Sequence, residues 1–111
     1  MAAAHLPQAK SRLFTAVLLL WIRVISAFTE QLITASANGA NSVYATDVNG
    51  DGFVDILVAS YHDDKVRLFL NDGNTASPDF TEQLITASAD DAISVYATDV
   101  NGDGFVDILV A

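Results

Sequence analysis

One short stretch of the sequence repeats oxygen-bearing side chains at regular spacing. Positions 1, 3, 5 and 9 of this nine-residue loop are occupied by Asp47, Asn49, Asp51 and Asp55, and position 6 is a glycine. A hard cation such as Ca²⁺ takes roughly six to eight oxygen ligands from a loop that curls around it. The glycine permits the sharp turn that a residue with a Cβ would resist. The spacing therefore predicts a calcium site.

The same nine residues return unchanged later in the chain. The matching positions of this second loop are Asp99, Asn101, Asp103 and Asp107. Without a metal ion, each loop would hold three like charges close together, and a divalent cation would offset them. Two intact copies predict two sites of the same kind. No acid, base or nucleophile stands beside either loop, so we expect the metal to have a structural role.

Other interpretations of the loop fit less well. A β-turn rich in Asp, Asn and Gly needs no metal, but it does not explain the aspartate at position 9 or the second copy. An EF-hand shares positions 1, 3, 5 and 6, yet it needs a glutamate at position 12 and flanking helices. Position 12 here is Val58 or Val110, in a β-branched run. A dockerin-like module fails for the same reason, and Mg²⁺ prefers fewer carboxylates and more waters.

The loops belong to a long internal repeat. Residues 28–59 and 80–111 align without gaps at a constant offset of 52 residues, and only three of the 32 positions differ. The differing pairs are Asn38/Asp90, Gly39/Asp91 and Asn41/Ile93. A period of this length is typical of solenoids, propellers and arrays. Because the three differences cluster, we expect them to lie in a tolerant surface loop.

Within one period, the pattern of apolar residues is that of β-strands. Short alternating or continuous apolar runs are separated by turn residues such as Asn-Asp-Gly, and no stretch after residue 28 shows helical caps or periodicity. The seven predicted strands are 28–34, 41–46, 54–61, 65–70, 80–86, 93–98 and 106–111. Four short strands per period predict an all-β fold of antiparallel, four-stranded β-propeller blades. The metal loop then joins two strands of one blade.

The stretch Val43–Ala59 and its copy Val95–Ala111 resemble the FG-GAP repeat family, also described as VCBS-type repeats. The family occurs in integrin α-subunit propellers and in many secreted proteins. The resemblance covers nearly all of residues 28–111. It implies that the side chains at positions 1, 3, 5 and 9 bind Ca²⁺, together with the carbonyl oxygen at position 7. The implied ligands are Asp47, Asn49, Asp51, Phe53 and Asp55 in the first loop, and Asp99, Asn101, Asp103, Phe105 and Asp107 in the second.

The number of repeats departs from the family pattern. Family propellers have about seven blades, and a closed propeller needs at least about four. Residues 28–111 hold two copies of the period, the second truncated, or about one and a half blades. A repeat protein of this size leaves apolar faces and strand edges open. We therefore expect an incomplete propeller that self-associates when it is made alone.

The first 27 residues have a different character. A weakly basic start is followed by a ten-residue, mostly apolar run from Leu13 to Ile22, then Arg23 and a small residue, Ala27. This order predicts a secretory signal peptide at 1–27, cleaved after Ala27. The run is too short to span a bilayer. A buried segment and an uncleaved signal anchor are the alternatives.

Charge and composition narrow the classes of partner. The chain has 111 residues, no cysteine and a net charge of −9, and residues 28–111 hold all 14 acidic residues and two basic ones. Such a surface should repel nucleic acid and anionic membranes. Ser60, His62 and Asp63 lie too close in sequence for a catalytic triad, and His62 is expected to be exposed. The three tyrosines are expected on strands, packed between blades: Tyr44, Tyr61 and Tyr96.

These observations predict a calcium-binding, non-catalytic β-propeller repeat protein. The resemblance implies an adhesion or interaction scaffold that is secreted or on the cell surface, with a protein partner that the sequence does not identify. Two alternatives stay open. The repeats could be an accessory part of a larger secreted enzyme, or the product of a truncated gene without a function of its own.

Overall fold

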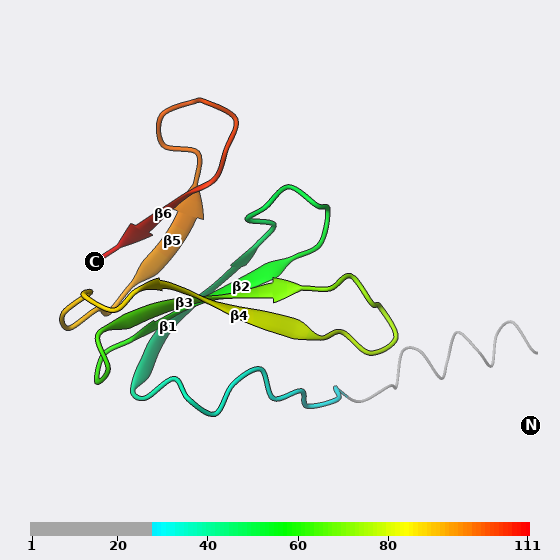
Figure 1. Ribbon diagram of the computed structural model, residues 1–111, viewed down its shortest axis with the longest axis horizontal. Coiled ribbons are helices and arrows are strands. Elements are labelled where there is room, and N and C mark those ends of the chain that lie inside the picture. Colours follow the sequence, from blue (N-terminus) through cyan, green and yellow to red (C-terminus); the bar gives the residue numbers. More distant parts are fainter. Residues whose placement is uncertain (1–27) are drawn as a thin grey trace, which may run out of the picture. The chain divides into compact units, whose positions relative to one another are not determined.

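The computed structural model describes residues 28–111, so the predicted signal peptide at 1–27 lies outside the described residues. Leu32–Ala111 forms one compact unit that carries every strand described here. The strands are β1 Ala40–Thr46, β2 Asp55–Ser60, β3 Lys65–Asn71, β4 Phe80–Thr86, β5 Val95–Thr98 and β6 Asp107–Val110 (Figure 1). The described residues form antiparallel sheets and no helix, which confirms the predicted all-β class.

The first four strands form one antiparallel sheet in the order β1-β2-β3-β4. Each strand pairs with the next in the chain, as expected for short runs joined by local turns. The near-continuous apolar run of β2 is buried along almost its whole length, because β2 has a strand on either side and both faces of the sheet are covered around it. The sheet is four-stranded and antiparallel, as predicted for a blade, but its fourth strand is β4 from the second copy of the period and not residues 28–34. It also confirms that the loop from Asp47 joins two strands of that blade.

One predicted strand is absent from the described residues. Phe28–Thr34 has the same seven residues as β4, yet it forms no strand, so six of the seven predicted strands are present. A strand makes its hydrogen bonds to a neighbour and none to itself, so pairing decides whether the sequence becomes a strand. β4 has β3 beside it. The first copy of the heptapeptide has no such pairing.

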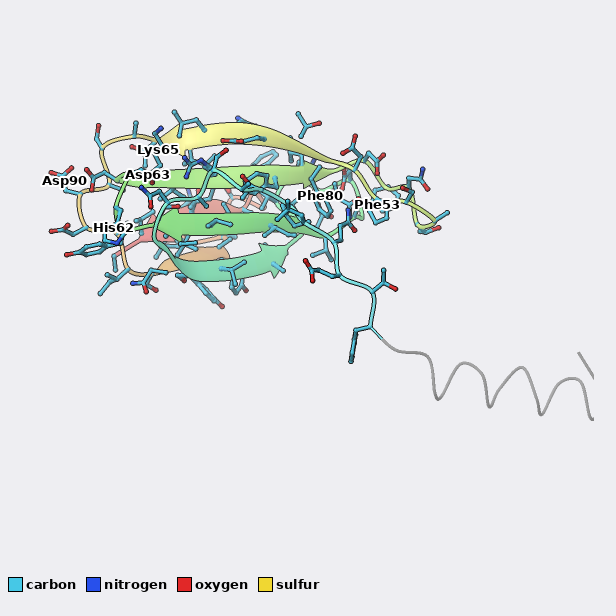
Figure 2. The ribbon with its side chains drawn as sticks, turned by 90° about the horizontal axis from the view of Figure 1, so that it is seen from below. Phe53, His62, Asp63, Lys65, Phe80 and Asp90 are labelled. Atoms are coloured by element: carbon cyan, nitrogen blue, oxygen red, sulfur yellow. The ribbon has the colours of Figure 1, made fainter. Side chains whose placement is uncertain are left out.

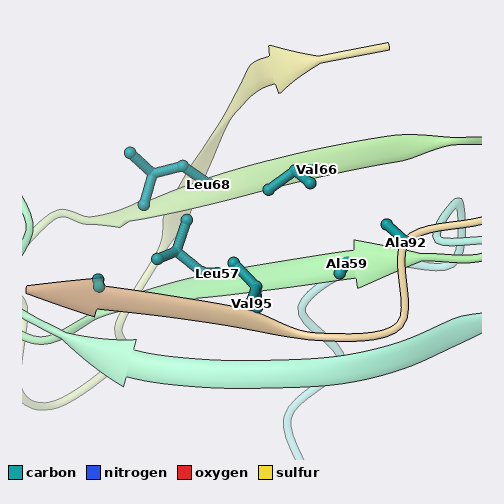
Figure 3. Packing of buried hydrophobic residues seen from close by; sticks show 7 residues of the cluster. Leu57, Ala59, Val66, Leu68, Ala92 and Val95 are labelled. Carbon is teal, nitrogen blue, oxygen red and sulfur yellow. The ribbon is translucent and has the colours of Figure 1, made fainter. Parts of the chain in front are cut away.

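The second repeat contributes a hairpin, β5–β6, that packs on one face of the four-stranded sheet. The core between them consists of Leu57, Ala59, Val66 and Leu68 from the sheet and Ala92, Val95 and Ala97 from the second repeat. Figure 3 shows Ala92 and Val95 facing the sheet residues. The seven side chains are small or branched and are buried, so the two repeats share a single core.

The other face of the sheet is partly covered by the segment before β1. Residues 32–39 cross this face, opposite β5 and β6 (Figures 1 and 2). Val58 and Phe69 are buried on the sheet, and a pocket of about 380 Å³ lies between the segment, β1 and Val58. No helix in the described part of the chain is long and apolar enough to cross a membrane.

Two of the three tyrosines lie between the repeats, as predicted. The ring centroids of Tyr44 on β1 and Tyr96 on β5 are 4.6 Å apart, with a tilt of 54° between the ring planes. The prediction is wrong for Tyr61. It lies in the turn after β2, exposed, with its ring edge-on to His62. β2 ends one residue earlier than predicted because the chain turns there, and His62 is exposed as expected.

Four of the six positions that differ between the repeats lie in surface turns, as predicted: Asn38, Gly39, Asp90 and Asp91. The prediction is wrong for Asn41, which is on β1, while Ile93 lies just before β5. All but Gly39 are exposed, and Gly39 is half-buried. Gly39 has a φ of +67°, and its counterpart Asp91 keeps a positive φ of +55°. Aspartate tolerates this left-handed conformation better than most residues do. A Cβ on Gly39 would collide with the His62 ring, so glycine is needed in the first repeat for space as well as for φ.

Candidate metal centre

The first loop starts where β1 ends and closes where β2 begins. Thr46 pairs with Asp55 across the hairpin, which brings Asp47 and Asp55 to the same end of the sheet. One carboxylate oxygen from each of Asp47, Asp51 and Asp55 lies within 4.8 Å of the others. Three negative charges at this separation repel one another, and the group could hold a metal ion. The structure thus brings together the three carboxylates that the spacing singled out.

Backbone N–H groups wrap the loop around Asp47. Its Oδ1 accepts hydrogen bonds from the N–H of Gly50 at 2.8 Å and of Asp51 at 3.2 Å. Its Oδ2 accepts the N–H of Gly52 at 2.8 Å. Gly50 and Gly52 have φ values of +77° and +87°, while a Cβ on either would meet open space. These glycines are therefore required for their backbone conformation and not for room.

The middle of the loop is held by two short side-chain turns. Asn49 Oδ1 accepts the N–H of Asp51 at 3.2 Å, and Asp51 Oδ1 accepts the N–H of Phe53 at 2.9 Å. Such bonds fix the side chains relative to the backbone of the same loop. The Asn49 amide and the Phe53 carbonyl stay predicted ligands.

Asp55 links three strands. It is fully buried, and its Oδ2 accepts the N–H of Val48 at 2.9 Å. Its Oδ1 accepts the N–H of Asn71, at the end of β3, also at 2.9 Å. A buried carboxylate is costly unless it is hydrogen-bonded or paired with a positive charge. Two N–H donors meet part of this need, and a divalent cation would meet the rest.

Asn71 is a residue of this site that sequence reasoning missed. Besides its N–H bond to Asp55, its side-chain Nδ2 donates to the carbonyl oxygen of Val54 at 3.0 Å. Its Oδ1 accepts the N–H of Gly73, whose Cα lies against the Phe53 ring. The Asn-Asp-Gly sequence indicated only a turn. The position of Asn71 could have indicated its role. It is the last residue of β3, and because β3 runs antiparallel to β2, this end of β3 lies beside the start of β2.

The second loop repeats the backbone pattern of the first. Asp99 accepts the N–H groups of Gly102, Asp103 and Gly104 at 2.7 Å, 3.2 Å and 2.8 Å. These donors, Gly104 most of all, hold the pKa of Asp99 below its usual value. Asp107 Oδ2 accepts the N–H of Val100 at 2.9 Å. The bonds made by Asn101 and Asp103 also match those of their counterparts.

The two loops differ in how their carboxylates are gathered. Within residues 28–111, the grouping found for Asp47, Asp51 and Asp55 is not found for Asp99, Asp103 and Asp107. Asp107 is only half-buried, whereas Asp55 is fully buried. The ligand sets of both loops remain predictions, and the geometry favours the first loop. A pocket of about 290 Å³ separates the loops, lined by residues 47–50 and 104–106.

A second polar cluster lies at the other end of the sheet. Figure 2 shows His62 and Asp63 at the end opposite Phe53. The buried guanidinium of Arg67 donates to Asp63 at 2.6 Å, Glu82 at 3.1 Å and Ser60 at 3.2 Å. Arg67 lowers the pKa of Asp63. Ser60 and Asp63 are thus bonded to an arginine on β3, and the cluster ties β2, β3 and β4 together.

Comparison with known proteins gives one match. A family model described as FG-GAP-like repeat matches residues 47–110, which is more than half of the chain. The matched region begins at the first aspartate of the first loop and ends on β6. No curated protein and no solved structure matches the chain significantly.

Proposed function

Since the chain belongs to the FG-GAP-like repeat family, we propose that it is a calcium-binding, non-catalytic β-propeller repeat module. In this proposal it acts as an interaction or adhesion scaffold outside the cell or on its surface. The observation that carries the calcium part is the grouping of three carboxylates within 4.8 Å in a loop of the right spacing.

The donor set favours Ca²⁺ among the common cations. Carboxylate, amide and carbonyl oxygens are hard ligands, which excludes a preference for soft metals. The first loop offers three carboxylates and one amide, whereas Mg²⁺ prefers one or two carboxylates and keeps several waters. The metal would be structural, because it would tie the end of β1 to the start of β2.

The expected affinity is modest. Extracellular calcium modules have Kd values of about 10⁻⁴ to 10⁻³ M. At about 1 mM Ca²⁺ and a Kd of about 0.1 mM, one site adds roughly 1.4 kcal/mol to the free energy of unfolding. In a domain of this size, that corresponds to a rise in Tm of about 6–11 °C for each site.

Calorimetric titration of the full chain with CaCl₂, after chelator treatment, tests the proposal. Asp51→Asn removes one charge from the first loop but keeps an oxygen for the Phe53 N–H, so it should abolish first-loop binding without unfolding the hairpin. Asp103→Asn is the matched change in the second loop, where the same bond reaches Phe105. Absence of both heat and thermal stabilisation up to about 10 mM Ca²⁺ would refute the calcium part.

The extracellular scaffold role is supported by the family match and by the acidic surface. Repeats of this family are typical of extracellular proteins. Residues 28–111 carry a net charge of −12, which suits calcium-rich surroundings more than contact with nucleic acid. N-terminal sequencing of material recovered from the culture medium tests this part, with Phe28 as the expected first residue.

A further inference from the structure

Asn71 lies beside the first metal loop although it belongs to a different strand. It is the last residue of β3, and continuing the antiparallel register of β2 and β3 to this residue places it opposite Val54. Its pairing partner on β4 is Phe80. Figure 2 shows Phe53 and Phe80 at the same end of the sheet. The end of β3 therefore lies next to residues 53–55 of the loop.

Asn71 holds this part of the loop by its backbone and by its side chain. The backbone N–H donates to Asp55 Oδ1 at 2.9 Å, and the side-chain Nδ2 donates to the carbonyl oxygen of Val54 at 3.0 Å. The start of the loop is held differently, by N–H groups of the loop itself that donate to Asp47. The loop thus has two supports, and β3 supplies the second one.

The Asp55 carboxylate keeps acceptor capacity for a cation. It is fully buried, and each of its oxygens accepts one backbone N–H, from Val48 at Oδ2 and from Asn71 at Oδ1. An ionised carboxylate has about four acceptor sites, so sites remain on both oxygens. The two N–H donors fix the orientation of the group. A carboxylate that is already oriented loses less freedom when it binds a cation.

Phe53, whose carbonyl oxygen is a predicted ligand, is held from the same side. Asn71 Oδ1 accepts the N–H of Gly73 at 2.9 Å, and Gly73 lies against the Phe53 ring. A Cβ on Gly73 would collide with this ring, so the close approach requires glycine. Asn71 therefore acts on the last two predicted ligands of the loop, on Asp55 directly and on Phe53 through Gly73.

The connection between β3 and β4 is fixed by hydrogen bonds of its own. The N–H of Asp72 donates to the carbonyl oxygen of Asp79 at 3.0 Å. Asp72 Oδ1 accepts the N–H groups of Asn74 at 2.9 Å and of Asp79 at 3.1 Å. None of these bonds involves residues 47–55 or needs a metal ion. The connection can therefore hold Asn71 in place before a cation binds.

We propose that Asn71 is a positioning residue of the first calcium site, and that calcium bound in the loop between β1 and β2 fixes the end of β3 in return. This role rests on the proposed calcium function. Replacing a residue that orients a metal ligand typically weakens metal binding by about 10- to 100-fold. Such coupling is reciprocal, so calcium must stabilise the contact of Asn71 with the loop by the same factor as the contact stabilises calcium binding.

The alternative role for Asn71 is purely structural. Asparagine side chains close turns by accepting the N–H two residues later, as Asn71 does with Gly73. A turn of this kind would stabilise the fold equally with and without calcium, and it would leave the calcium affinity unchanged. Calcium affinity and local hydrogen exchange therefore separate the two roles.

The calcium affinity of Asn71→Ala is the first test. The substitution is combined with Asp103→Asn, so that the heat of a CaCl₂ titration comes from the first loop, and circular dichroism in chelator checks the fold. We expect the Kd to rise about tenfold relative to Asp103→Asn alone. Asn74→Ala in the same background is the matched control, because the Asn74 side chain accepts N–H groups within the same connection. Its Kd should stay within about twofold.

Hydrogen exchange in the parent chain tests the same link without a substitution at Asn71. Exchange of the Asn71 amide is measured by NMR in chelator and at about 1 mM Ca²⁺. Because opening of this bond would require release of the metal, exchange should slow about tenfold for a Kd of about 0.1 mM. The Ala89 amide, bonded to the Asp64 carbonyl oxygen at the other end of the sheet, should change less than about twofold. Asp51→Asn should remove the slowing at Asn71.

The results separate this role from the calcium function itself. Equal Kd values for Asn71→Ala and Asn74→Ala, or equal slowing at Asn71 and Ala89, would overturn the proposal, because β3 would then have no specific link to the metal. If Asn71→Ala does not fold in chelator, the exchange measurement on the parent chain decides. Absence of heat and of slowing in the parent chain would instead refute calcium binding.

Discussion

Single residues in this chain work mainly as links between strands. Asp55 accepts the N–H of Val48, in the loop after β1, and the N–H of Asn71, at the end of β3, so the candidate metal loop depends on a strand that is not part of it. Arg67 does the same at the other end of the sheet, where its ion pairs reach Asp63 and Glu82. Both residues are buried charged groups with hydrogen-bond partners on neighbouring segments, and for Arg67 two of these partners are carboxylates.

The Arg67 cluster predicts an acid-sensitive component of stability. Arg67 lowers the pKa of Asp63, so this contribution is present above the ordinary aspartate pKa of about 4 and is lost as pH falls through the lower folded-state value. Asp63→Asn should reduce the free energy of unfolding by about 1–2 kcal/mol at pH 7. The difference should shrink towards zero below about pH 3. Urea unfolding at a series of pH values measures it.

Asp64→Asn is the control for this prediction. Asp64 lies in the same turn, and its Oδ1 accepts the N–H of Asp91, a bond that asparagine can keep. The free energy of unfolding of the Asp64→Asn variant should follow the same pH dependence as that of the parent chain. A pH dependence of Asp64→Asn equal to that of Asp63→Asn would show that net charge, and not the pair with Arg67, is responsible.

At the level of elements, local sequence decides the hairpins but not every strand. The candidate metal loop and its two strands could be predicted because turn residues and apolar alternation act within about ten residues. The conformation of the heptapeptide Phe28–Thr34 could not be predicted in this way. Its identical copy, Phe80–Thr86, is a strand because it pairs with β3. Asn71 and Tyr61 were missed for a related reason. Their positions depend on where one strand ends against another.

The turn before β1 gives a prediction at this scale. Gly39→Ala should lower the free energy of unfolding by about 2–3 kcal/mol, because alanine resists a φ of +67° and its Cβ would meet the His62 ring. Asp91→Ala, at the equivalent turn with a φ of +55°, should cost less than about 1 kcal/mol. Thermal unfolding of both variants measures the difference. Equal losses would show that the ring contact contributes nothing.

At the scale of the whole molecule, equivalent residues of the two repeats can differ in burial. Val95 is 4% exposed because β5 packs on the four-stranded sheet, whereas the equivalent Val43 on β1 is 68% exposed. The same residue is thus core in one repeat and surface in the other. The apolar pattern of the strand could not separate them, because residues 42–59 and 94–111 are identical and only the surroundings of the two valines differ.

This contrast predicts different costs for one substitution. Val95→Ala removes two buried methyl groups and should lower the free energy of unfolding by about 2 kcal/mol. Val43→Ala should change it by less than about 0.5 kcal/mol. Both are measured by urea unfolding followed by circular dichroism. Similar losses would mean that the two repeats do not share the core described here.

The identity of the two hairpins also bears on how the chain reaches its fold. β3 meets β2 across the short turn at residues 61–64, whereas β6 offers the same strand sequence but is separated from β3 by residues 72–106. Loop closure costs about 0.6 kcal/mol for each doubling of length, which favours the nearer hairpin by roughly 2 kcal/mol. The three substitutions between the repeats all lie outside β2 and β6. The length of the connection, and not the sequence of the strand, therefore decides that β3 pairs with β2 and not with β6.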